Sequence, residues 1–267
     1  MYSDFIVEPR DLPGDTRLLD CRFSLLDPEQ GLADYRAGHI PGAHYVHLNR
    51  DLSGPVGRYG GRHPLPAPET FATTLAGMGI GPETEVVAYD DSGFAFASRL
   101  WWMMRALGYR PPRLLNGGYG AWRALAQTPE TGDATPVPIQ APPAGAYSGY
   151  LDRDAVIESQ AANAQLVDAR EPKRYEGLEE PIDPVGGHIP GAVNRPWQGV
   201  TDDRGRVLPP DELRDHFGDV LDRESVVVYC GSGVTACVNL FALALLGRDD
   251  PALYPGSWSD WCSYLVD

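Results

Sequence analysis

The residue most suited to covalent chemistry in this sequence is Cys230. It follows the run Val226–Tyr229, which begins with three valines, and it precedes Gly231, Gly233 and an apolar segment. This pattern predicts a buried strand, a tight loop and a helix, with Cys230 at the carboxyl end of a parallel strand, where open α/β sheets bind ligands. The two glycines would let backbone N–H groups converge near the positive end of the helix, and such a loop stabilises an anion. We therefore expect Cys230 to be a nucleophilic thiolate rather than a buried, inert thiol.

The segments around this loop alternate between strand-like and helix-like patterns. Residues 234–246 are apolar on nearly every face, which indicates a buried helix packed on a parallel sheet and too short to span a membrane. Helical patterns also occupy residues 95–107 and 209–217, between short β-rich runs. This alternation predicts an α/β fold, in which a mostly parallel sheet is covered by helices on both faces.

The chain also contains an internal repeat. Leu-Asp-Cys-Arg at residues 19–22 and Val-Asp-Ala-Arg at residues 167–170 each precede a Gly-His-Ile-Pro-Gly-Ala segment, which contains His39 in the first copy and His188 in the second. Repetition of several segments in one order indicates a duplicated domain.

The two copies differ at the loop that carries the cysteine. Asp90 stands in the first copy where Cys230 stands in the second, so we expect the first copy to be catalytically inactive. Residues 128–147 collect prolines and small residues, a composition that holds neither a helix nor a central strand. We therefore predict domains at residues 1–127 and 148–267, joined by a linker at 128–147.

Length, charge and cysteine usage restrict the class of protein. With 267 residues and a formal net charge of −15, the chain can form two cores and would be repelled by nucleic acid and by anionic membrane surfaces. Its four cysteines lack the spacing of a disulfide framework or a zinc site, so we expect reduced thiols, no metal and no cofactor. Residues 1–5 lack the basic and apolar regions of a signal peptide, and we expect a cytoplasmic protein.

Several segments together resemble the two-domain rhodanese-like sulfurtransferases, and the resemblance covers nearly the whole chain. These segments are the paired Gly-His-Ile-Pro-Gly-Ala stretches, Arg99–Trp102 with Gly108 and Tyr109, two Leu-x-x-Gly-x-x-x-x-Trp stretches ending at Trp122 and Trp261, and the cysteine loop. The resemblance implies two tandem rhodanese-like α/β domains and a persulfide on Cys230. The second domain is then the catalytic one.

Within this family, the loop from Cys230 to Ala236 resembles that of the 3-mercaptopyruvate sulfurtransferases. Rhodaneses that prefer thiosulfate typically carry cationic residues directly after the cysteine, where this chain has Gly and Ser. We expect the loop residues to bind the substrate; they are Gly231, Ser232, Gly233, Val234 and Thr235.

Arginines are the expected partners of an anionic sulfur donor. Arg174, in Arg-Tyr-Glu-Gly, matches the substrate-binding arginine of the family and would hold a carboxylate in bidentate fashion. A second arginine, which mercaptopyruvate enzymes commonly carry before the second His-Ile-Pro-Gly, is replaced by Glu-Pro-Ile-Asp-Pro at residues 180–184. Either Arg195 takes over its role or the donor differs from mercaptopyruvate. Some mercaptopyruvate enzymes also use a serine-centred relay with a histidine of the first domain, which makes His39 a supporting candidate.

The expected mechanism proceeds through two transfers of sulfur. The Cys230 thiolate attacks the outer sulfur of the donor, and a thiol, reduced thioredoxin or cyanide then removes that sulfur from the persulfide. Ser232 is placed to donate a hydrogen bond to the donor carbonyl. Asp168 and Arg170, at the end of a predicted strand, are expected to pair with each other and to fix the loop.

Two other classes of protein compete with this interpretation. A cysteine phosphatase needs an arginine six residues after the cysteine, where this chain has Ala236. A non-enzymatic sulfur-relay or regulatory module is consistent with the loss of the thiol in the first copy, but the intact Cys230 loop favours an enzyme. We therefore predict a sulfurtransferase that uses 3-mercaptopyruvate, with thiosulfate:cyanide sulfurtransferase as the alternative.

Overall fold

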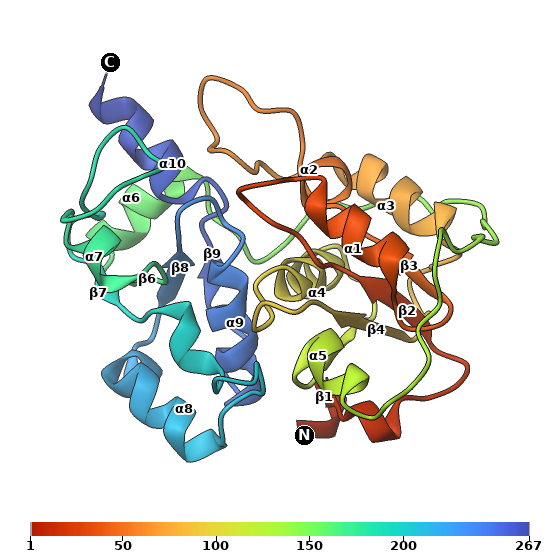
Figure 1. Ribbon diagram of the computed structural model, residues 1–267. Coiled ribbons are helices and arrows are strands. Elements are labelled where there is room, and N and C mark those ends of the chain that lie inside the picture. Colours follow the sequence, from red (N-terminus) through yellow and green to blue (C-terminus); the bar gives the residue numbers. More distant parts are fainter. Residues whose placement is uncertain (1, 267) are drawn as a thin grey trace. The chain divides into compact units, whose positions relative to one another are not determined.

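The computed structural model describes residues 2–266, which form two compact units. Unit 1 runs to Gly54 and includes Pro66–Ser148 and Thr201–Val207, whereas unit 2 includes Pro55–Leu65, Gly149–Val200 and the chain from Leu208 onward. Each unit thus contains one short segment from the opposite half of the chain. Figure 1 shows the course of the chain through both units.

Unit 1 contains a five-stranded parallel sheet in the order β1-β5-β4-β2-β3. The strands are β1 (Ile6–Val7), β2 (Arg17–Asp20), β3 (Ala43–Tyr45), β4 (Val86–Tyr89) and β5 (Arg113–Leu115). The helices are α1 (Gln30–Ala37), α2 (Leu48–Asp51), α3 (Pro68–Gly77), α4 (Ala97–Ala106) and α5 (Gly118–Arg123), with 3-10 turns η1 (Tyr2–Asp4) and η2 (Pro9–Asp11).

Unit 2 contains a four-stranded parallel sheet in the order β7-β6-β8-β9. The strands are β6 (Gln165–Asp168), β7 (Val193–Asn194), β8 (Val226–Tyr229) and β9 (Ala252–Leu253). The helices are α6 (Arg153–Ala161), α7 (Pro172–Tyr175), α8 (Pro210–Phe217), α9 (Ala236–Leu245) and α10 (Ser257–Trp261), with 3-10 turns η3 (Trp197–Val200), η4 (Gly218–Asp222) and η5 (Cys262–Leu265).

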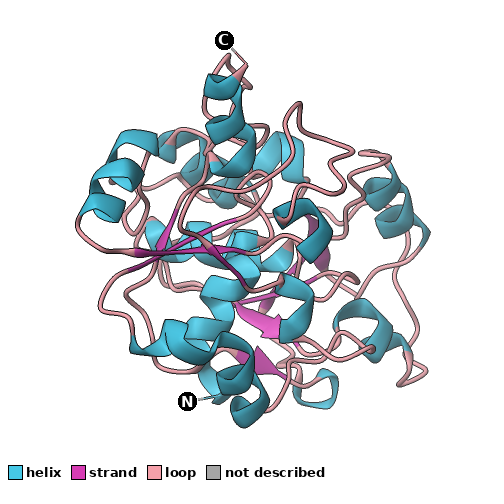
Figure 2. Cartoon of the chain, turned by 90° about the vertical axis from the view of Figure 1, so that its left-hand side faces the viewer, coloured by secondary structure: helices cyan, strands magenta, loops and turns pink. Residues whose placement is uncertain are grey.

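The prediction of parallel sheets covered by helices is confirmed. Every pair of neighbouring strands in the two sheets is parallel, and Figure 2 shows helices and loops around the strands. Strands β4 and β8 are buried along their whole length, because helices cover both of their faces and leave no side for polar residues. Residues 128–147, the expected linker, pack within unit 1, where Glu130 forms a β-bridge with His39.

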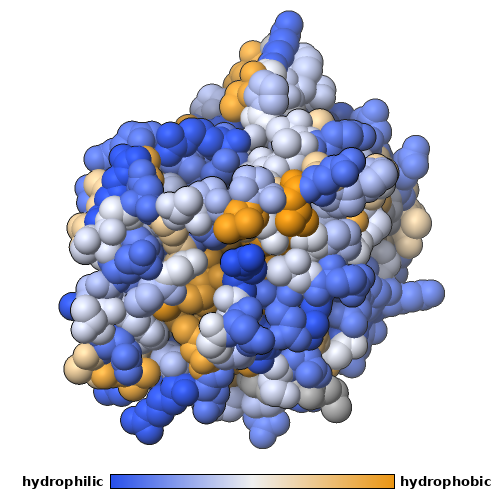
Figure 3. All heavy atoms as spheres, turned by 90° about the vertical axis from the view of Figure 1, so that its right-hand side faces the viewer, coloured by the Kyte–Doolittle hydropathy of each residue, from blue (hydrophilic) through white to orange (hydrophobic). Residues whose placement is uncertain are grey.

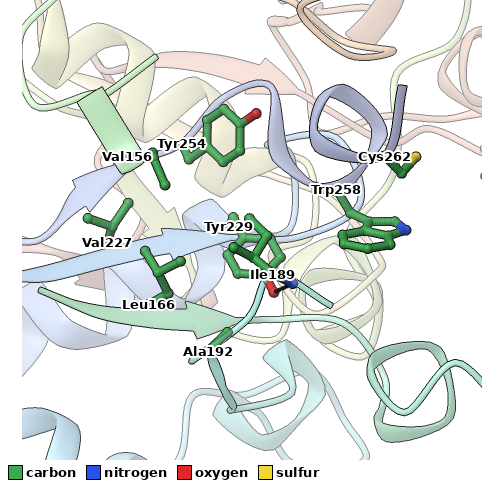
Figure 4. Close-up of a cluster of buried hydrophobic side chains, with 9 residues drawn as sticks. All are labelled: Val156, Leu166, Ile189, Ala192, Val227, Tyr229, Tyr254, Trp258 and Cys262. Atoms are coloured by element: carbon green, nitrogen blue, oxygen red, sulfur yellow. Dashed lines mark hydrogen bonds between the residues drawn. The ribbon is translucent and has the colours of Figure 1, made fainter. Parts of the chain in front are cut away.

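The internal repeat extends to the hydrophobic cores. In unit 2 the Tyr229 hydroxyl accepts a hydrogen bond from the Ile189 N–H (3.1 Å) inside the cluster drawn in Figure 4. In unit 1 the Tyr89 hydroxyl accepts the corresponding bond from the Ile40 N–H (3.2 Å). A tyrosine at the end of the central strand therefore fixes the His-Ile-Pro-Gly turn in each copy.

Polar side chains are prominent on one face of the molecule. Figure 3 shows one face of the molecule, on which hydrophilic side chains predominate and apolar ones gather in patches between them. Within residues 2–266, no helix has the length and apolar character required to cross a membrane.

Candidate active site

Cys230 directly follows β8 and is 2% exposed. The carbonyl groups of Cys230 and Gly231 accept hydrogen bonds from the N–H groups of Trp258 (3.0 Å) and Ser259 (2.9 Å) in α10. Because a carbonyl and the following N–H point in opposite directions across a trans peptide, the N–H groups of Gly231 and Ser232 face away from α10. Neither N–H has an acceptor among the described residues, so both are available to an anion beside Cys230.

The loop depends on glycine and on one strained serine. Gly233 has φ +75°, and a Cβ there would lie 2.4 Å from the carbonyl oxygen of Pro255, so no other residue fits. Ser257 has φ +55°, a conformation that costs a non-glycine residue about 1–3 kcal/mol. Its hydroxyl accepts the Cys230 N–H (3.1 Å) and donates to the Tyr254 carbonyl (2.9 Å). Ser257 therefore ties the amide of the candidate nucleophile to α10.

Val234 and Thr235 complete the turn into α9, which Figure 1 shows running beside β8. Their carbonyl oxygens accept hydrogen bonds from Cys237 and Val238, each at 3.1 Å. These two residues thereby set the start of the helix whose positive end faces the cysteine loop.

Arg174 ends in a cluster of charged side chains over Gly231. Its guanidinium donates to Glu180 at 2.7 and 3.2 Å and to Asp183 at 3.1 Å. Its Nη1 lies 3.4 Å from the position that a Cβ on Gly231 would occupy. The expected substrate-binding arginine thus lies beside the cysteine loop.

A second arginine at this place is Arg62, which sequence reasoning did not find. Arg62 Nη1 donates to Asp183, and Nη2 lies 3.1 Å from the position of a Cβ on Gly231. Burial lowers the pKa of Arg62, and repulsion by Arg174 lowers it further, while the Cys230 thiolate acts in the opposite direction. The two guanidinium groups therefore share Asp183 as their counter-ion.

Ser232 forms a hydrogen bond with His63, which also escaped the sequence analysis. His63 Nδ1 lies 2.7 Å from Ser232 Oγ, and both residues are buried. His39 is placed differently, because it is fully buried in unit 1, stacks on Tyr35 and has its Nδ1 2.9 Å from the Tyr35 carbonyl. The histidine that contacts Ser232 is therefore His63 and not His39.

Asp168 and Arg170 form a buried ion pair at the end of β6. Arg170 Nη2 lies 2.6 Å from Asp168 Oδ2, and the side chains are 1% and 0% exposed. Arg170 also donates to the Gly187 carbonyl (2.6 Å) and to Glu180 (3.2 Å). The pair therefore positions Glu180, which in turn holds Arg174.

Arg195 has its described contacts elsewhere in unit 2. Its guanidinium donates to the carbonyls of Phe217 (3.1 Å) and Asn194 (2.9 Å) and to Asp219 (3.0 Å). These acceptors lie at the end of β7 and around the end of α8, and none belongs to the cysteine loop. Arg62, rather than Arg195, is therefore the second cation beside the cysteine loop.

The other three cysteines, which are Cys21, Cys237 and Cys262, lie outside the loop after β8. Cys237 is fully buried in α9 and its Sγ contacts the Gly233 carbonyl (3.4 Å). Burial raises the pKa of the Cys21 and Cys262 thiols above the ordinary value. Within residues 2–266, no three His, Cys, Asp or Glu side chains come together as metal ligands.

Three comparisons with known proteins show the family of this chain. The Rhodanese-like domain model matches residues 8–125 and 153–264. A relative from Pseudomonas aeruginosa, named a probable 3-mercaptopyruvate sulfurtransferase, is 45% identical over 92% of this chain and 89% of its own. The thiosulfate sulfurtransferase of Cricetulus griseus is 35% identical over 92% of this chain and 84% of its own. The solved 3-mercaptopyruvate sulfurtransferase from Leishmania major has a TM-score of 0.86 at 30% identity, covering 98% of this chain and 75% of that one.

The family model spans both halves of the chain, and the named relatives match it over nearly its whole length. This chain therefore belongs to the rhodanese-like family and is a sulfurtransferase.

Proposed function

We propose that this enzyme takes sulfur from 3-mercaptopyruvate, carries it as a Cys230 persulfide and passes it to a thiol or to cyanide. The observation that carries the choice of donor is the 2.7 Å contact between His63 Nδ1 and Ser232 Oγ. Cleavage of the carbon–sulfur bond of mercaptopyruvate generates an enolate, which a hydroxyl backed by a histidine stabilises at the carbonyl oxygen. Thiosulfate has no carbonyl group, so this pair would contribute less to its cleavage.

In the first half-reaction, the Cys230 thiolate attacks the sulfur of mercaptopyruvate. A sulfur–sulfur bond forms as the carbon–sulfur bond breaks, and the electron pair of the broken bond enters the enolate of pyruvate. Ser232 donates a hydrogen bond to the enolate oxygen, and protonation of the enolate carbon gives pyruvate. Arg174 holds the donor carboxylate through charged hydrogen bonds. The amides of residues 231–235 and the positive end of α9 hold the persulfide.

In the second half-reaction, a nucleophile removes the outer sulfur. A thiolate or cyanide attacks that sulfur and forms a new bond to it, while the Cys230 thiolate leaves and is ready for the next donor. A small thiol, reduced thioredoxin and cyanide all have the chemistry that this step requires. Because the two half-reactions share only the enzyme, we expect ping-pong kinetics.

The other predicted residues receive the following roles in this proposal. Asp168 and Arg170 position Arg174 through Glu180, and the supporting role expected of His39 passes to His63. Arg195 receives no role, because its guanidinium is engaged by the segment around Phe217. The first domain is inactive, since Asp90 occupies the place of the nucleophile.

Thiosulfate remains the second candidate donor because of one specific observation. The loop itself carries no cation after Cys230, but Arg62 Nη2 and Arg174 Nη1 lie 3.1 and 3.4 Å from the position of a Cβ on Gly231. These guanidinium groups could meet the sulfite that departs from thiosulfate. The relative from Cricetulus griseus is named a thiosulfate sulfurtransferase.

Steady-state assays with both donors and one thiol acceptor test the proposal. We expect a higher kcat/KM for mercaptopyruvate than for thiosulfate. Ser232→Ala should lower kcat/KM for mercaptopyruvate by about tenfold to a hundredfold, because one stabilising donor at the enolate oxygen is lost, and should change thiosulfate turnover much less. A preference for thiosulfate in the unmodified enzyme would contradict the choice of donor.

We also propose a cytoplasmic location. All four cysteines are free thiols, and a cytosolic redox poise keeps both Cys230 and a thiol acceptor such as thioredoxin reduced. Fractionation of the expressing cell with an antibody against the protein tests this, and recovery in a periplasmic or secreted fraction would contradict it.

A further inference from the structure

The segment Pro55–Leu65 reaches the cysteine loop from the N-terminal half of the chain and is part of unit 2. The Gly60 N–H donates to the Asp260 carboxylate (2.7 Å), and the Arg62 N–H donates to Ser259 Oγ (3.2 Å). Asp260 is itself buried and accepts a hydrogen bond from the Tyr254 hydroxyl (2.6 Å). These bonds to α10 fix the backbone two residues before Arg62 and at Arg62 itself.

The Arg62 guanidinium is held at one end and is available at the other. Nη1 donates to Asp183, whose side chain is 3% exposed, whereas Nη2 has no hydrogen-bond acceptor among the described residues. The same holds for Arg174, which uses Nε and Nη2 for Glu180 and Asp183 and leaves Nη1 without an acceptor in the described chain. The two available nitrogens both face Gly231.

Gly231 leaves this place open. A Cβ on Gly231 would approach Arg62 Nη2 to 3.1 Å and Arg174 Nη1 to 3.4 Å. Because Gly231 has no Cβ, no side chain of its own fills this space, which lies next to Cys230. An anionic group in this space would receive N–H groups from two guanidinium groups, which is the arrangement that binds carboxylates and sulfonates best.

We propose that Arg62 is a donor-binding residue, which holds the anionic group of the sulfur donor together with Arg174 above Gly231. This inference rests on the proposed sulfur transfer through Cys230. It supplies the second cation that the acidic sequence Glu-Pro-Ile-Asp-Pro at residues 180–184 lacks.

Asp183 explains how two guanidinium groups remain together when no donor is bound. Like charges this close repel each other, and the pKa of Arg62 is lowered first by burial and further by Arg174. Asp183 offers one carboxylate oxygen to each arginine, which offsets this repulsion and orients the opposite edges of both groups toward Gly231. Donor binding then requires no rearrangement of the pair.

Alkylation of Cys230 by iodoacetate and iodoacetamide tests the anion site without sulfur transfer. In both reagents the thiolate displaces iodide from a CH2 group, but only iodoacetate carries a carboxylate. The ratio of the iodoacetate rate to the iodoacetamide rate therefore measures how strongly the site beside Cys230 favours an anionic reagent. The variants are Arg62→Ala and Arg62→Lys, and Arg58→Ala removes the same charge from an exposed position of the same segment as a control.

We expect Arg62→Ala to lower the iodoacetate to iodoacetamide ratio by about tenfold, with Arg62→Lys intermediate and Arg58→Ala close to the unmodified protein. The same Arg62→Ala protein should load sulfur from mercaptopyruvate about tenfold to a hundredfold less efficiently, with an unchanged rate of discharge to a neutral thiol. If Arg62→Ala fails to fold, Arg62→Lys replaces it in the test, because lysine keeps the positive charge and loses the paired N–H donors of the guanidinium.

Two outcomes separate this inference from the proposed function. An unchanged alkylation ratio in Arg62→Ala overturns the role of Arg62 even if sulfur transfer proceeds. If neither reagent labels the buried Cys230, unchanged sulfur loading from mercaptopyruvate in Arg62→Ala overturns it instead. A lowered ratio in a protein that transfers no sulfur from mercaptopyruvate would leave the anion site standing and would contradict the choice of donor.

Discussion

The loops after β4 and β8 follow the same path from a buried strand into a helix but hold different groups at their centre. In unit 2 the centre is Cys230, and in unit 1 it is Asp90, which is 1% exposed. The Asp90 carboxylate accepts hydrogen bonds from four backbone N–H groups, those of Ser92, Phe94, Phe96 and Ala97, at 2.9 to 3.1 Å. Unit 1 therefore shows that the backbone N–H groups of this kind of loop converge on an oxygen acceptor at its centre.

The carboxyl group in unit 1 is a permanent part of the chain. Burial raises the pKa of the Asp90 carboxyl, and hydrogen bonds from the loop amides oppose that effect. In unit 2 the place of the carboxyl group belongs to the Cys230 sulfur, which in the proposed mechanism alternates between a thiolate and a persulfide. Under the proposed function, the Asp90 carboxyl therefore fills in the first copy the place that the second copy keeps for a persulfide.

The scaffold around the two loops is otherwise shared. Asp20 and Arg22 form the same buried pair (2.6 Å) as Asp168 and Arg170. The Asp90 carbonyl accepts from the Tyr119 N–H (2.9 Å), as the Cys230 carbonyl accepts from Trp258. The differences in chemistry therefore arise from a few residues placed on a common frame.

One of these differences is an insertion. His39 follows Tyr35 by four residues and His188 follows Tyr175 by thirteen, although each histidine contacts the carbonyl of its tyrosine in the same way. The nine extra residues fall between Tyr175 and His188, in the stretch that carries Glu180 and Asp183. Only the second copy thus has the acidic residues that hold Arg174 and Arg62.

The largest difference between the copies should appear when the nucleophile is removed. Cys230→Ser should reduce turnover by at least about a thousandfold, because a serine hydroxyl is far less acidic and less nucleophilic toward sulfur. Cys237→Ser, in the same helix-loop region, should retain activity. Substantial turnover by the Cys230→Ser protein would show that sulfur is carried elsewhere.

The buried ion pairs Asp20–Arg22 and Asp168–Arg170 should contribute similarly to stability and differently to activity. Removing one partner of a buried pair typically costs about 3–5 kcal/mol, so Arg22→Ala and Arg170→Ala should both lower the free energy of unfolding in urea by about that amount. Only Arg170→Ala should also raise KM for the donor, because Arg170 holds Glu180 and thereby Arg174. An equal effect of both variants on KM would mean that the pairs act through stability alone.

Arg174 should matter in one half-reaction only. Arg174→Ala should lower the rate of sulfur loading from the donor by about tenfold to a hundredfold, the equivalent of one charged hydrogen bond of about 1.5–3 kcal/mol. Discharge of a preloaded persulfide to a small neutral thiol should be little changed. Stopped-flow measurement of each half-reaction separates the two, and equal losses in both would indicate a structural role.

The smallest expected effect concerns the strained serine. Gly118 in unit 1 has φ +56° and precedes Tyr119 as Ser257, with φ +55°, precedes Trp258. Ser257→Gly should relieve strain of about 1–3 kcal/mol and lose hydrogen bonds worth about 1 kcal/mol each, so that stability changes by less than about 2 kcal/mol. Activity should fall severalfold, because the Cys230 amide loses its anchor. Unchanged kcat would show that this anchor is dispensable.

The parts of the structure that the sequence predicted are those that local patterns encode. The run before Cys230 and the glycines after it are contiguous, and the Asp-x-Arg spacing at 168 and 170 brings the pair together within one turn of the chain. Parallel sheets followed from the alternation of short apolar strands and helices. Each of these features depends on neighbours in sequence.

The parts that were missed depend on long-range contacts. Arg62 meets Asp183 across 121 residues and His63 meets Ser232 across 169, and the segment Pro55–Leu65 has no helical or strand pattern that would reveal its position. The one local signal that could have found it is its Gly-Gly-Arg-His sequence, which places two charged or titratable residues directly after two glycines. Sequence alone allows Arg195 as one replacement for the missing second arginine, but the direction of its side chain is set by a carbonyl and a carboxylate at residues 217–219, which sequence spacing does not show.

The most direct test of the difference between the two loops is to find where sulfur goes. The protein is treated with mercaptopyruvate, digested under non-reducing conditions and mapped by mass spectrometry. One added sulfur is predicted on the peptide that contains Cys230, lost on treatment with cyanide and absent from the Cys230→Ser protein. Added sulfur on the peptides of Cys21, Cys237 or Cys262, or on no peptide at all, would contradict the assignment of the second loop as the sulfur carrier.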